Sequence, residues 1–252
     1  MTRSSIAAVE EFIGAAPAMA TLGALETLLA DTVSRLGFDY YAVGYHIIPA
    51  GDAPAVTGFT NYPASWRGEL RLGLGHDPVV RAAERRAAGF AWDELPRLLD
   101  LTANEKGRLE RAARHGLAHG FTIPVHVPGE ALGSSNFAVK GDRALPRRNF
   151  VAAQALGTHA FEAMRGLLSR EAGGKLARPA PMPEPLTRRQ RECLAFVARG
   201  KSDTVIAEML GIRPHTVTEH IEAARRRYGV ATRSQLIVRA LIAGDLTYGE
   251  IA

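Results

Sequence analysis

The stretch "SDTVIAEMLGIRPHTVTEHIEAARRRYG", residues 202–229, contains two helical patterns separated by a glycine turn. The first pattern begins at Ser202, a residue type that caps helix N-termini, and ends at Gly211. The second pattern runs to Gly229. Two short helices joined by a glycine-containing turn are typical of the helix-turn-helix motif. The apolar residues of the second pattern recur at helical spacing: Val217, Ile221 and Ala224.

The apolar face of the second predicted helix is buried, so its polar face is available to contact another molecule. In helix-turn-helix proteins, residues near the start of the second helix reach base edges, while flanking arginines and lysines neutralise phosphates. A glutamate accepts from the amine of cytosine, and a threonine donates, accepts or touches a thymine methyl group. We therefore expect base contacts from Thr218 and Glu222, beside Thr216. The residues expected at phosphates are Lys201, Arg213, Arg225 and Arg226.

The basic segment "ARRRYG", residues 224–229, has an alternative interpretation as a solvated helix end whose cations complement the helix dipole. The distribution of charge along the chain helps to decide between a solvated helix end and a DNA-binding segment. From Leu186 onward there are 11 Lys and Arg against 7 Asp and Glu, which is most of the excess of the whole chain, 31 against 26. Beside the helix-turn-helix spacing, this concentration of positive charge favours double-stranded DNA as the partner.

A further helix is predicted in "LTRRQRECLAFVARG", residues 186–200, with Thr187 as its N-cap and Gly200 at its end. The only cysteine of the chain, Cys193, falls within the apolar pattern of this helix. We expect it to be a small core residue rather than a redox group. A single cysteine also excludes an intramolecular disulfide.

A linker is predicted at residues 169–185, "SREAGGKLARPAPMPEP", which hold four prolines and two adjacent glycines. Proline cannot continue a helix, and proline-rich segments stay extended without a core. We therefore expect one domain at residues 1–168 and a second, DNA-binding domain at residues 186–252.

The N-terminal part alternates helical and strand patterns. Residues 22–36 place leucines and a valine on one helical face, before Gly37. Further helices are predicted at 77–88, 104–115 and 148–168, and strands at 40–48, 121–127 and 134–140. The predicted fold class is α+β: an N-terminal α/β/α sandwich with a central antiparallel sheet, joined by the proline-rich linker to an all-α helix-turn-helix domain.

Composition excludes several classes of protein. With 46% hydrophobic and 23% charged residues the chain is ordinarily globular. No run reaches the roughly 18 apolar residues that would span a bilayer, and acids interrupt the N-terminal apolar stretch that a signal peptide would need. We expect a cytoplasmic protein without a membrane partner.

An acid among aromatic residues is the most unusual feature of the N-terminal part. In "NYPASWRGELRLGLGHDPVV", residues 61–80, Tyr62 and Trp66 precede Asp77, and Trp92 follows. A structural explanation is available for each residue. The spacing of Tyr62 and Trp66 suits packing of one helix face, and Asp77 before a proline suits a helix cap. The alternative is a buried site in which the carboxylate binds a ligand.

Residues 186–240 resemble the C-terminal DNA-binding domain of LuxR-type transcription regulators. In this family the last helix, residues 233–243, is the usual dimerisation surface, so a homodimer on a two-fold-symmetric operator is implied. Two positions depart from the family pattern: Gln190 replaces a usual glutamate, and Arg213 replaces a serine that commonly caps the second helix. The matching elements are Gly200-Lys201-Ser202, Ile206-Ala207, Leu210-Gly211, Thr216-Val217, His220 and "GVATRSQ".

The segments "NYPASW", "DPVV", Trp92 and "HGLAHGFTIPVH" are similar to the autoinducer-binding domain of the quorum-sensing branch, whose ligands are N-acyl homoserine lactones. Such a ligand has one amide N–H and two carbonyls, and burying them unpaired costs about 1–3 kcal/mol each. The resemblance implies that Asp77 accepts from the amide, Trp66 donates to the lactone carbonyl and Tyr62 donates to the acyl carbonyl. Trp92 and Phe90 would enclose the head group. No cofactor is implied.

Departures from this second resemblance leave the acyl group open. Leu70 stands where the family often has tyrosine, and Asn136 stands where a small hydroxyl residue often faces the acyl carbonyl. These changes motivate an alternative, a LuxR-type regulator that acts without a lactone or senses another small molecule. An enzyme, for instance a lactone hydrolase using His76 and Asp77, is a third possibility. We find no metal-ligand set and no serine or cysteine nucleophile motif, and we expect neither a catalytic residue nor a metal site.

Overall fold

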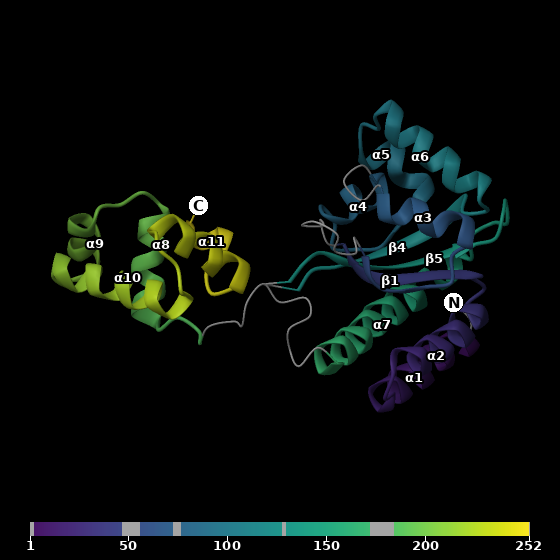
Figure 1. The fold of residues 1–252 in the computed structure, drawn as a ribbon, viewed down its shortest axis with the longest axis horizontal. Coiled ribbons are helices and arrows are strands. Elements are labelled where there is room, and N and C mark those ends of the chain that lie inside the picture. Colours follow the sequence, from purple (N-terminus) through teal and green to yellow (C-terminus); the bar gives the residue numbers. More distant parts are fainter. Residues whose placement is uncertain (1–2, 47–55, 73–76, 128–129, 172–183, 252) are drawn as a thin grey trace. The chain divides into compact units, whose positions relative to one another are not determined.

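The computed structural model describes residues 3–46, 56–72, 77–127, 130–171 and 184–251. They form two compact units, one N-terminal up to Glu171 and one C-terminal from Glu184 (Figure 1). Most of the predicted linker, 169–185, lies outside the described residues. The last helix of the N-terminal unit continues to Glu171, past the predicted domain end at 168. In the part of the chain that the structure describes, no helix has the length and apolar character needed to cross a membrane.

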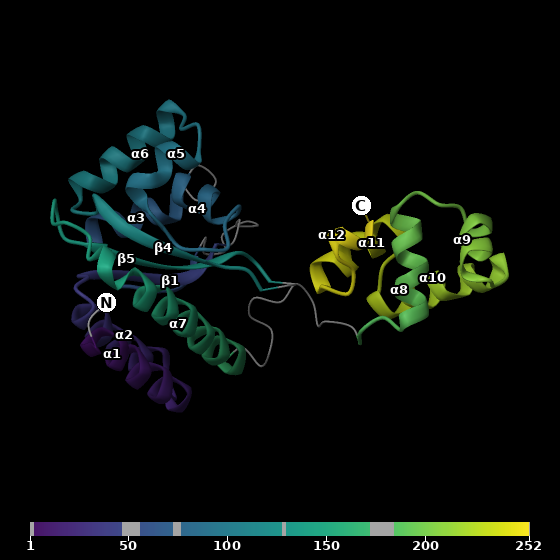
Figure 2. The same ribbon diagram turned by 180° about the vertical axis from the view of Figure 1, so that it is seen from behind.

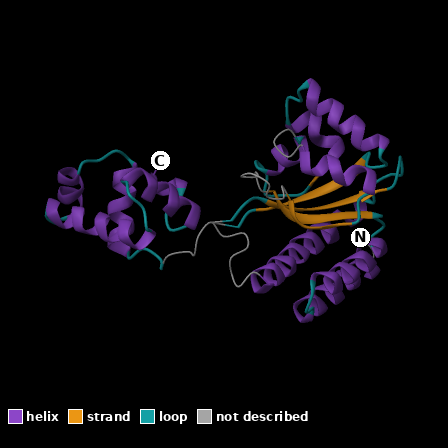
Figure 3. Cartoon of the chain, in the orientation of Figure 1, coloured by secondary structure: helices purple, strands orange, loops and turns teal. Residues whose placement is uncertain are grey.

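A five-stranded antiparallel sheet lies at the centre of the N-terminal unit, in the order β2-β1-β5-β4-β3 (Figure 3). The predicted antiparallel sheet is confirmed. Strands β2 and β3 were not predicted, because "VTGFT" contains a glycine and β3 has only 2 residues. The strands are β1 (Tyr40–His46), β2 (Val56–Thr60), β3 (Phe90–Ala91), β4 (His119–Val125) and β5 (Gly133–Val139).

Helices cover both faces of this sheet, as the views in Figures 1 and 2 show, so the predicted α/β/α sandwich is confirmed. One face carries α1 (Arg3–Ala15), α2 (Leu22–Arg35) and α7 (Phe150–Glu171). The other carries α3 (Ala64–Leu72), α4 (Pro78–Ala83), α5 (Leu95–Leu98) and α6 (Ala103–Arg114). Short 3-10 helices are η1 (Ala16–Ala18), η3 (Trp92–Glu94) and η4 (Arg147–Asn149).

One helix prediction needs correction, and one helix was not predicted. The helix expected over 77–88 ends at Ala83, because residues 84–89 form turns and bends before β3. Helix α1 was not predicted, although Ala8, Val9 and Phe12 on its buried face contribute to the core.

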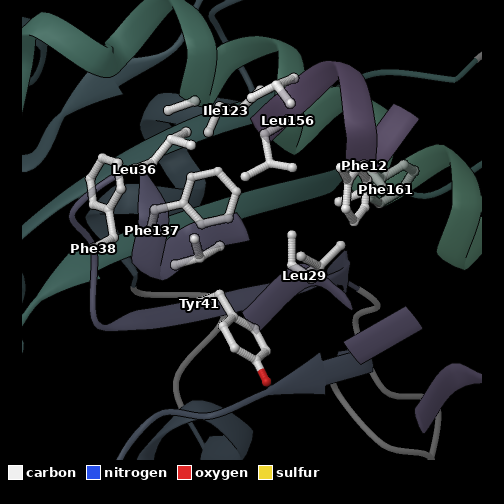
Figure 4. Packing of buried hydrophobic residues seen from close by; sticks show 14 of the residues in the cluster. Phe12, Leu29, Leu36, Phe38, Tyr41, Ile123, Phe137, Leu156 and Phe161 are labelled. Carbon is white, nitrogen blue, oxygen red and sulfur yellow. The ribbon is translucent and has the colours of Figure 1, made fainter. Parts of the chain in front are cut away.

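Alternation along β1 decides which side chains fill the main core and which face the opposite layer. Tyr41, Val43 and Tyr45 point to the α1, α2 and α7 side, because successive residues of a strand face opposite sides of the sheet. The Tyr45 ring packs edge-on against Phe161 of α7, with ring centroids 4.9 Å apart. Figure 4 shows this core, in which Phe12, Leu29, Phe137 and Leu156 from separate elements meet.

The C-terminal unit is helical, as predicted, with α8 (Arg188–Ala198), α9 (Asp203–Leu210), α10 (Pro214–Tyr228), α11 (Arg233–Ala243) and α12 (Tyr248–Ile251). Thr187 and Gln190 form a capping box, so the glutamine keeps the acceptor function of the glutamate that the family usually has. Arg213 occupies the N-cap of α10 without a side-chain cap. Cys193 is fully buried, as expected.

Candidate functional site

A cavity of about 420 Å³ lies between the sheet and the helical layer of α3, α4 and α6. Its sheet side is formed by alternate residues of β1, Ala42, Gly44 and His46, together with residues of β2 and β5. Five residues predicted from the sequence line this cavity: Tyr62, Trp66, Asp77, Trp92 and Asn136.

Of the two other predicted ligand contacts, one does not line the cavity and the other lies outside the described side chains. Phe90 is fully enclosed in the apolar cluster behind the cavity and exposes none of its surface, so it does not line the wall. Leu70 belongs to α3, but its side chain lies outside the described part of the chain. His76, the partner of Asp77 in the hydrolase hypothesis, also lies outside the described residues.

Tyr62 and Trp66 bring two hydrogen-bond donors to the cavity. A hydrogen bond from the Tyr62 amide to Thr60 Oγ1, 3.0 Å, fixes the chain as it leaves β2 for α3. Both side chains are buried, and neither the Tyr62 hydroxyl nor the Trp66 indole N–H has a hydrogen-bond partner among the described residues. Burial, with the nearby Asp77 charge, raises the pKa of Tyr62, so this hydroxyl stays protonated. Both groups therefore remain available to donate.

Asp77 is both a helix cap and a residue of the cavity wall. Its Oδ1 accepts from the Val79 amide at 2.9 Å, which confirms the predicted cap of α4. Its Oδ2 accepts from Arg108 Nε at 2.9 Å. The side chain is 14% exposed. A carboxylate offers about four acceptor positions, so Asp77 keeps capacity for a ligand N–H.

Arg108 on α6 was not recognised from the sequence. Its side chain is only 5% exposed, it lines the cavity, and it donates from Nη1 to the Glu69 carbonyl at 3.3 Å. Its guanidinium lies 5.3 Å from the centre of the Trp66 ring. The segment "NEKGRLERAAR" is highly charged, and within it Arg108 is expected to be exposed to solvent. Its helical spacing from the buried Glu105 and Ala112 is the signal that places it on the inner face.

A chain of hydrogen bonds crosses the sheet beneath the cavity. Trp92 Nε1 donates to Thr122 Oγ1 at 2.9 Å, and Thr122 donates to Asn136 Oδ1 at 2.7 Å. Asn136 Nδ2 in turn donates to Ser134 Oγ at 2.9 Å, and Ser134 pairs with His46 Nε2 at 2.7 Å. Because its N–H is already used, Trp92 contributes an apolar ring to the cavity wall.

His46 is a neutral residue of this network. Burial lowers its pKa to about 4, and the nearby Asp77 charge offsets only part of that effect. Within the described ranges, no three His, Cys, Asp or Glu side chains are grouped so that they could hold a metal ion. The polar side chains that line the cavity, among them Tyr62, Trp66 and Asn136, are hydrogen-bonding groups.

In the C-terminal unit, α10 carries the predicted base contacts. Thr218 Oγ1 donates to Asp203 Oδ2 of α9 at 2.8 Å, and Glu222 accepts from Arg225 Nη1 at 2.7 Å. Both side chains are half-buried and paired inside the domain. Thr216 is also half-buried.

The predicted phosphate contacts divide into two groups. Lys201, Arg213 and Arg226 are exposed and suited to phosphates. Arg225 is half-buried and, besides pairing with Glu222, donates to the Ala231 carbonyl. Arg225 therefore ties the end of α10 to the turn that follows, and its contact with a phosphate stays a prediction.

Two family models match the chain and together span most of it. The autoinducer binding domain matches residues 21–164, and the bacterial regulatory proteins of the luxR family match residues 184–240.

Individual relatives agree. The transcriptional activator protein VanR of Vibrio anguillarum is 28% identical over 229 residues, which is 87% of this chain and 90% of that protein. The regulatory protein SdiA of Escherichia coli is 27% identical over 218 residues, 83% of this chain and 85% of that protein.

The crystal structure of E. coli SdiA is similar in fold, with a TM-score of 0.64 at 22% identity over 95% of this chain and 98% of that one. A structure of SdiA in complex with octanoyl-rac-glycerol gives a TM-score of 0.64 at 21% identity, over 98% of this chain and 99% of that one.

Proposed function

The chain belongs to the LuxR family of bacterial transcription regulators, with an autoinducer-binding domain followed by a helix-turn-helix DNA-binding domain, and from this we propose that its ligand is an N-acyl homoserine lactone. The relatives named above are transcription regulators rather than enzymes, and we propose that this chain signals by binding alone. The observation that carries the ligand assignment is the pair of unpartnered donors beside one acceptor: Tyr62, Trp66 and Asp77.

These three groups match the polar atoms of a lactone head group. The amide N–H requires one acceptor, which Asp77 offers, and the two carbonyls require donors, which the Tyr62 hydroxyl and the Trp66 indole offer. Leaving any of these groups unpaired in a closed cavity costs about 1–3 kcal/mol. A ligand that satisfies all of them at once is therefore favoured over a purely apolar molecule. The remaining cavity, walled by Trp92, Val79 and Leu117, would take the acyl chain.

Thermal unfolding with a panel of acyl homoserine lactones tests this assignment. A ligand at 100 times its Kd stabilises the folded state by about 2.7 kcal/mol, so one panel member should raise the Tm of the sensor domain by several degrees. The Trp66→Phe variant removes one donor and should lose about tenfold in affinity while staying folded. If no lactone shifts the Tm of a protein that is already folded, the lactone assignment fails.

A second candidate is a regulator that senses a different acylated molecule. It is motivated by Asp77, which already accepts from Val79 and Arg108 and so has less need of a ligand amide. An ester-linked acylglycerol, the class of ligand named for SdiA, has no amide N–H. Octanoylglycerol therefore belongs in the panel, and a larger shift from it than from every lactone would favour this candidate.

We propose further that the protein binds operator DNA as a homodimer through α10, with the ligand controlling the dimer. Glu222→Ala should alter which base pairs are preferred, because it removes an acceptor for cytosine. Arg226→Ala should weaken binding to all sequences and reduce the salt slope by about 1, because it removes one phosphate contact. Selection of operators from a randomised library, repeated at two salt concentrations, separates the two effects. Unchanged preference in Glu222→Ala would contradict its base-reading role.

A further inference from the structure

Asn136 lies at the middle of the cavity floor. It sits on β5, where it is opposite Ala42 of β1 and Thr122 of β4 in the strand register. It lines the cavity together with Ala42, Tyr62 and Trp92 and is only partly buried. A molecule that fills the cavity therefore contacts both Tyr62 and Asn136.

The orientation of this amide is fixed by chemistry. The Trp92 indole N–H can only donate, so Thr122 Oγ1 must accept from it at 2.9 Å. The Ala42 carbonyl can only accept, so the Asn136 atom 3.3 Å from it is the amide nitrogen, and the Asn136 atom 2.7 Å from Thr122 Oγ1 is left to accept the Thr122 hydroxyl proton. That atom is the Asn136 carbonyl oxygen, and the NH₂ group consequently points the other way.

Both N–H groups of Asn136 are used inside the protein. One donates to the Ala42 carbonyl at 3.3 Å and the other to Ser134 Oγ at 2.9 Å. The carbonyl oxygen accepts one hydrogen bond, from Thr122, and has a second lone pair. The Asn136 carbonyl oxygen can therefore accept one more hydrogen bond, while its NH₂ group has no N–H left to donate.

Thr60, a neighbouring polar residue of the cavity lining, does not alter this balance. The nitrogen His46 Nδ1, which has no hydrogen-bond partner among the described residues, lies further along the floor, on the far side of Ser134. Thr60 Oγ1 donates to the Tyr41 carbonyl at 2.8 Å and accepts from the Tyr62 amide at 3.0 Å. Its hydroxyl proton is therefore not available to a ligand either.

We infer that Asn136 selects for a ligand whose acyl group carries a hydroxyl group, which donates to the Asn136 carbonyl oxygen. This inference rests on the proposed lactone function and specifies its acyl class. A keto group at the same place would put its acceptor oxygen against the acceptor oxygen of Asn136. An unsubstituted chain would leave the Asn136 oxygen with only the hydrogen bond from Thr122. The expected order of affinity is hydroxyacyl, then unsubstituted acyl, then oxoacyl.

The test is a competition binding series with 3-hydroxyacyl, unsubstituted acyl and 3-oxoacyl homoserine lactones of equal chain length on the full-length protein. The wild type should bind the 3-hydroxyacyl ligand about tenfold more tightly than the 3-oxoacyl ligand, the ratio expected for one neutral hydrogen bond. Asn136→Leu keeps the size of the side chain and removes the acceptor, so this ratio should fall to about one. Asn104→Leu, at an exposed position on α6, is the matched control and should keep the wild-type ratio.

The outcomes separate this inference from the proposed function. Equal or tighter binding of the 3-oxoacyl ligand overturns the inference while the lactone assignment stands. A preference for the 3-hydroxyacyl ligand that persists in Asn136→Leu also overturns the inference, because another residue would then bind the hydroxyl group. Failure of every lactone to bind overturns both.

A second variant keeps the test decisive if Asn136→Leu does not fold. Thr122→Val removes the hydroxyl that holds the Asn136 oxygen in place. The amide can then turn an N–H toward the cavity, and the preference for 3-hydroxyacyl over 3-oxoacyl ligand should fall or reverse. An unchanged preference in Thr122→Val would count against the proposed role of Asn136.

Discussion

The ion pair between Asp77 and Arg108 joins two segments at the cavity wall. The carboxylate and the guanidinium come from positions 31 residues apart and are 14% and 5% exposed. Burying two charges is unfavourable, but each neutralises the other and Val79 supplies a further donor to the carboxylate. The pair therefore fixes α6 against the N-terminus of α4 and holds the acceptor of the proposed ligand site.

Arg108→Met should destabilise the sensor domain by about 3–5 kcal/mol, because it leaves the Asp77 carboxylate buried without its cation. Urea denaturation of the full-length protein measures this loss. Arg111→Met is the matched control. It lies on the same helix, is 45% exposed and should cost under about 1 kcal/mol. The double variant Asp77→Asn/Arg108→Met should recover part of the lost stability. A double variant with a lower free energy of unfolding than both single variants would contradict this explanation.

At the residue scale, sequence reasoning identified Tyr62, Trp66 and Asp77 because aromatic residues near an acid form a recognisable pattern. Arg108 lines the cavity without having been predicted to, and Phe90 is fully buried and is not part of the lining. Whether a side chain lines a cavity or lies behind its wall depends on how α6 and β3 pack, and local spacing does not contain that information.

At the scale of elements, Asp203 connects three helices of the DNA-binding unit. It receives two hydrogen bonds from Arg233 of α11, at 2.6 and 2.8 Å, and one from Thr218 of α10 at 2.8 Å. The hydrogen bond from Arg233, reinforced by Thr218 and opposed by partial burial, lowers the pKa of Asp203 below its ordinary value of 3.8. The ionised carboxylate thus positions the helix that would enter the major groove.

Asp203→Asn should loosen α9, α10 and α11 at neutral pH. Because the folded-state pKa is lowered, the stabilising contribution is present above pH 3.8 and is lost as pH falls through the folded-state pKa. The difference from wild type should therefore shrink in acid. Amide hydrogen exchange of peptides from these helices, in the full-length protein at pH 7 and at about pH 3, measures it. Glu219→Gln, on the exposed side of α10 at 61% exposure, should show no such loss. An Asp203→Asn effect that is equal at both pH values would contradict the ionic explanation.

Elements with strong periodicity or good caps were predictable, as in α2, α6 and the helices of the C-terminal unit. The short strands β2 and β3 were not, because pairing with β1 and β4 stabilises them more than their own composition does. Helix α1 was not predicted, although Val9 and Phe12 on its successive turns are buried.

At the scale of the whole molecule, the two units have separate hydrophobic cores, one around Phe137 and Phe161 and the other around Leu194 and Ile221. Each unit can therefore unfold as a cooperative transition of its own. The cavity is lined by residues of the first unit, between Ala42 and Asn136, so a ligand bound there contacts the unit that holds the first core.

Differential scanning calorimetry of the full-length protein should show two transitions, of which a bound lactone raises only that of the sensor domain. The shift should grow with ligand concentration, because the stabilisation follows RT ln(1 + [L]/Kd). DNA containing the operator should raise the other transition. A single transition that moves as one with lactone would show that the two units unfold together, in contrast to this expectation.

The sequence by itself determined the class of both units. Helical caps, apolar spacing and the glycine turns identify the helix-turn-helix unit, because those signals act over a few residues. The tertiary structure decided which polar groups are free. Among the described residues the Tyr62 and Trp66 donors have no partner, Asp77 is shared with Arg108, and both N–H groups of Asn136 are already bonded. Hydrogen-bond partners come from strands and helices distant in sequence, so the specificity of the cavity arises only when the sheet and its helices are assembled.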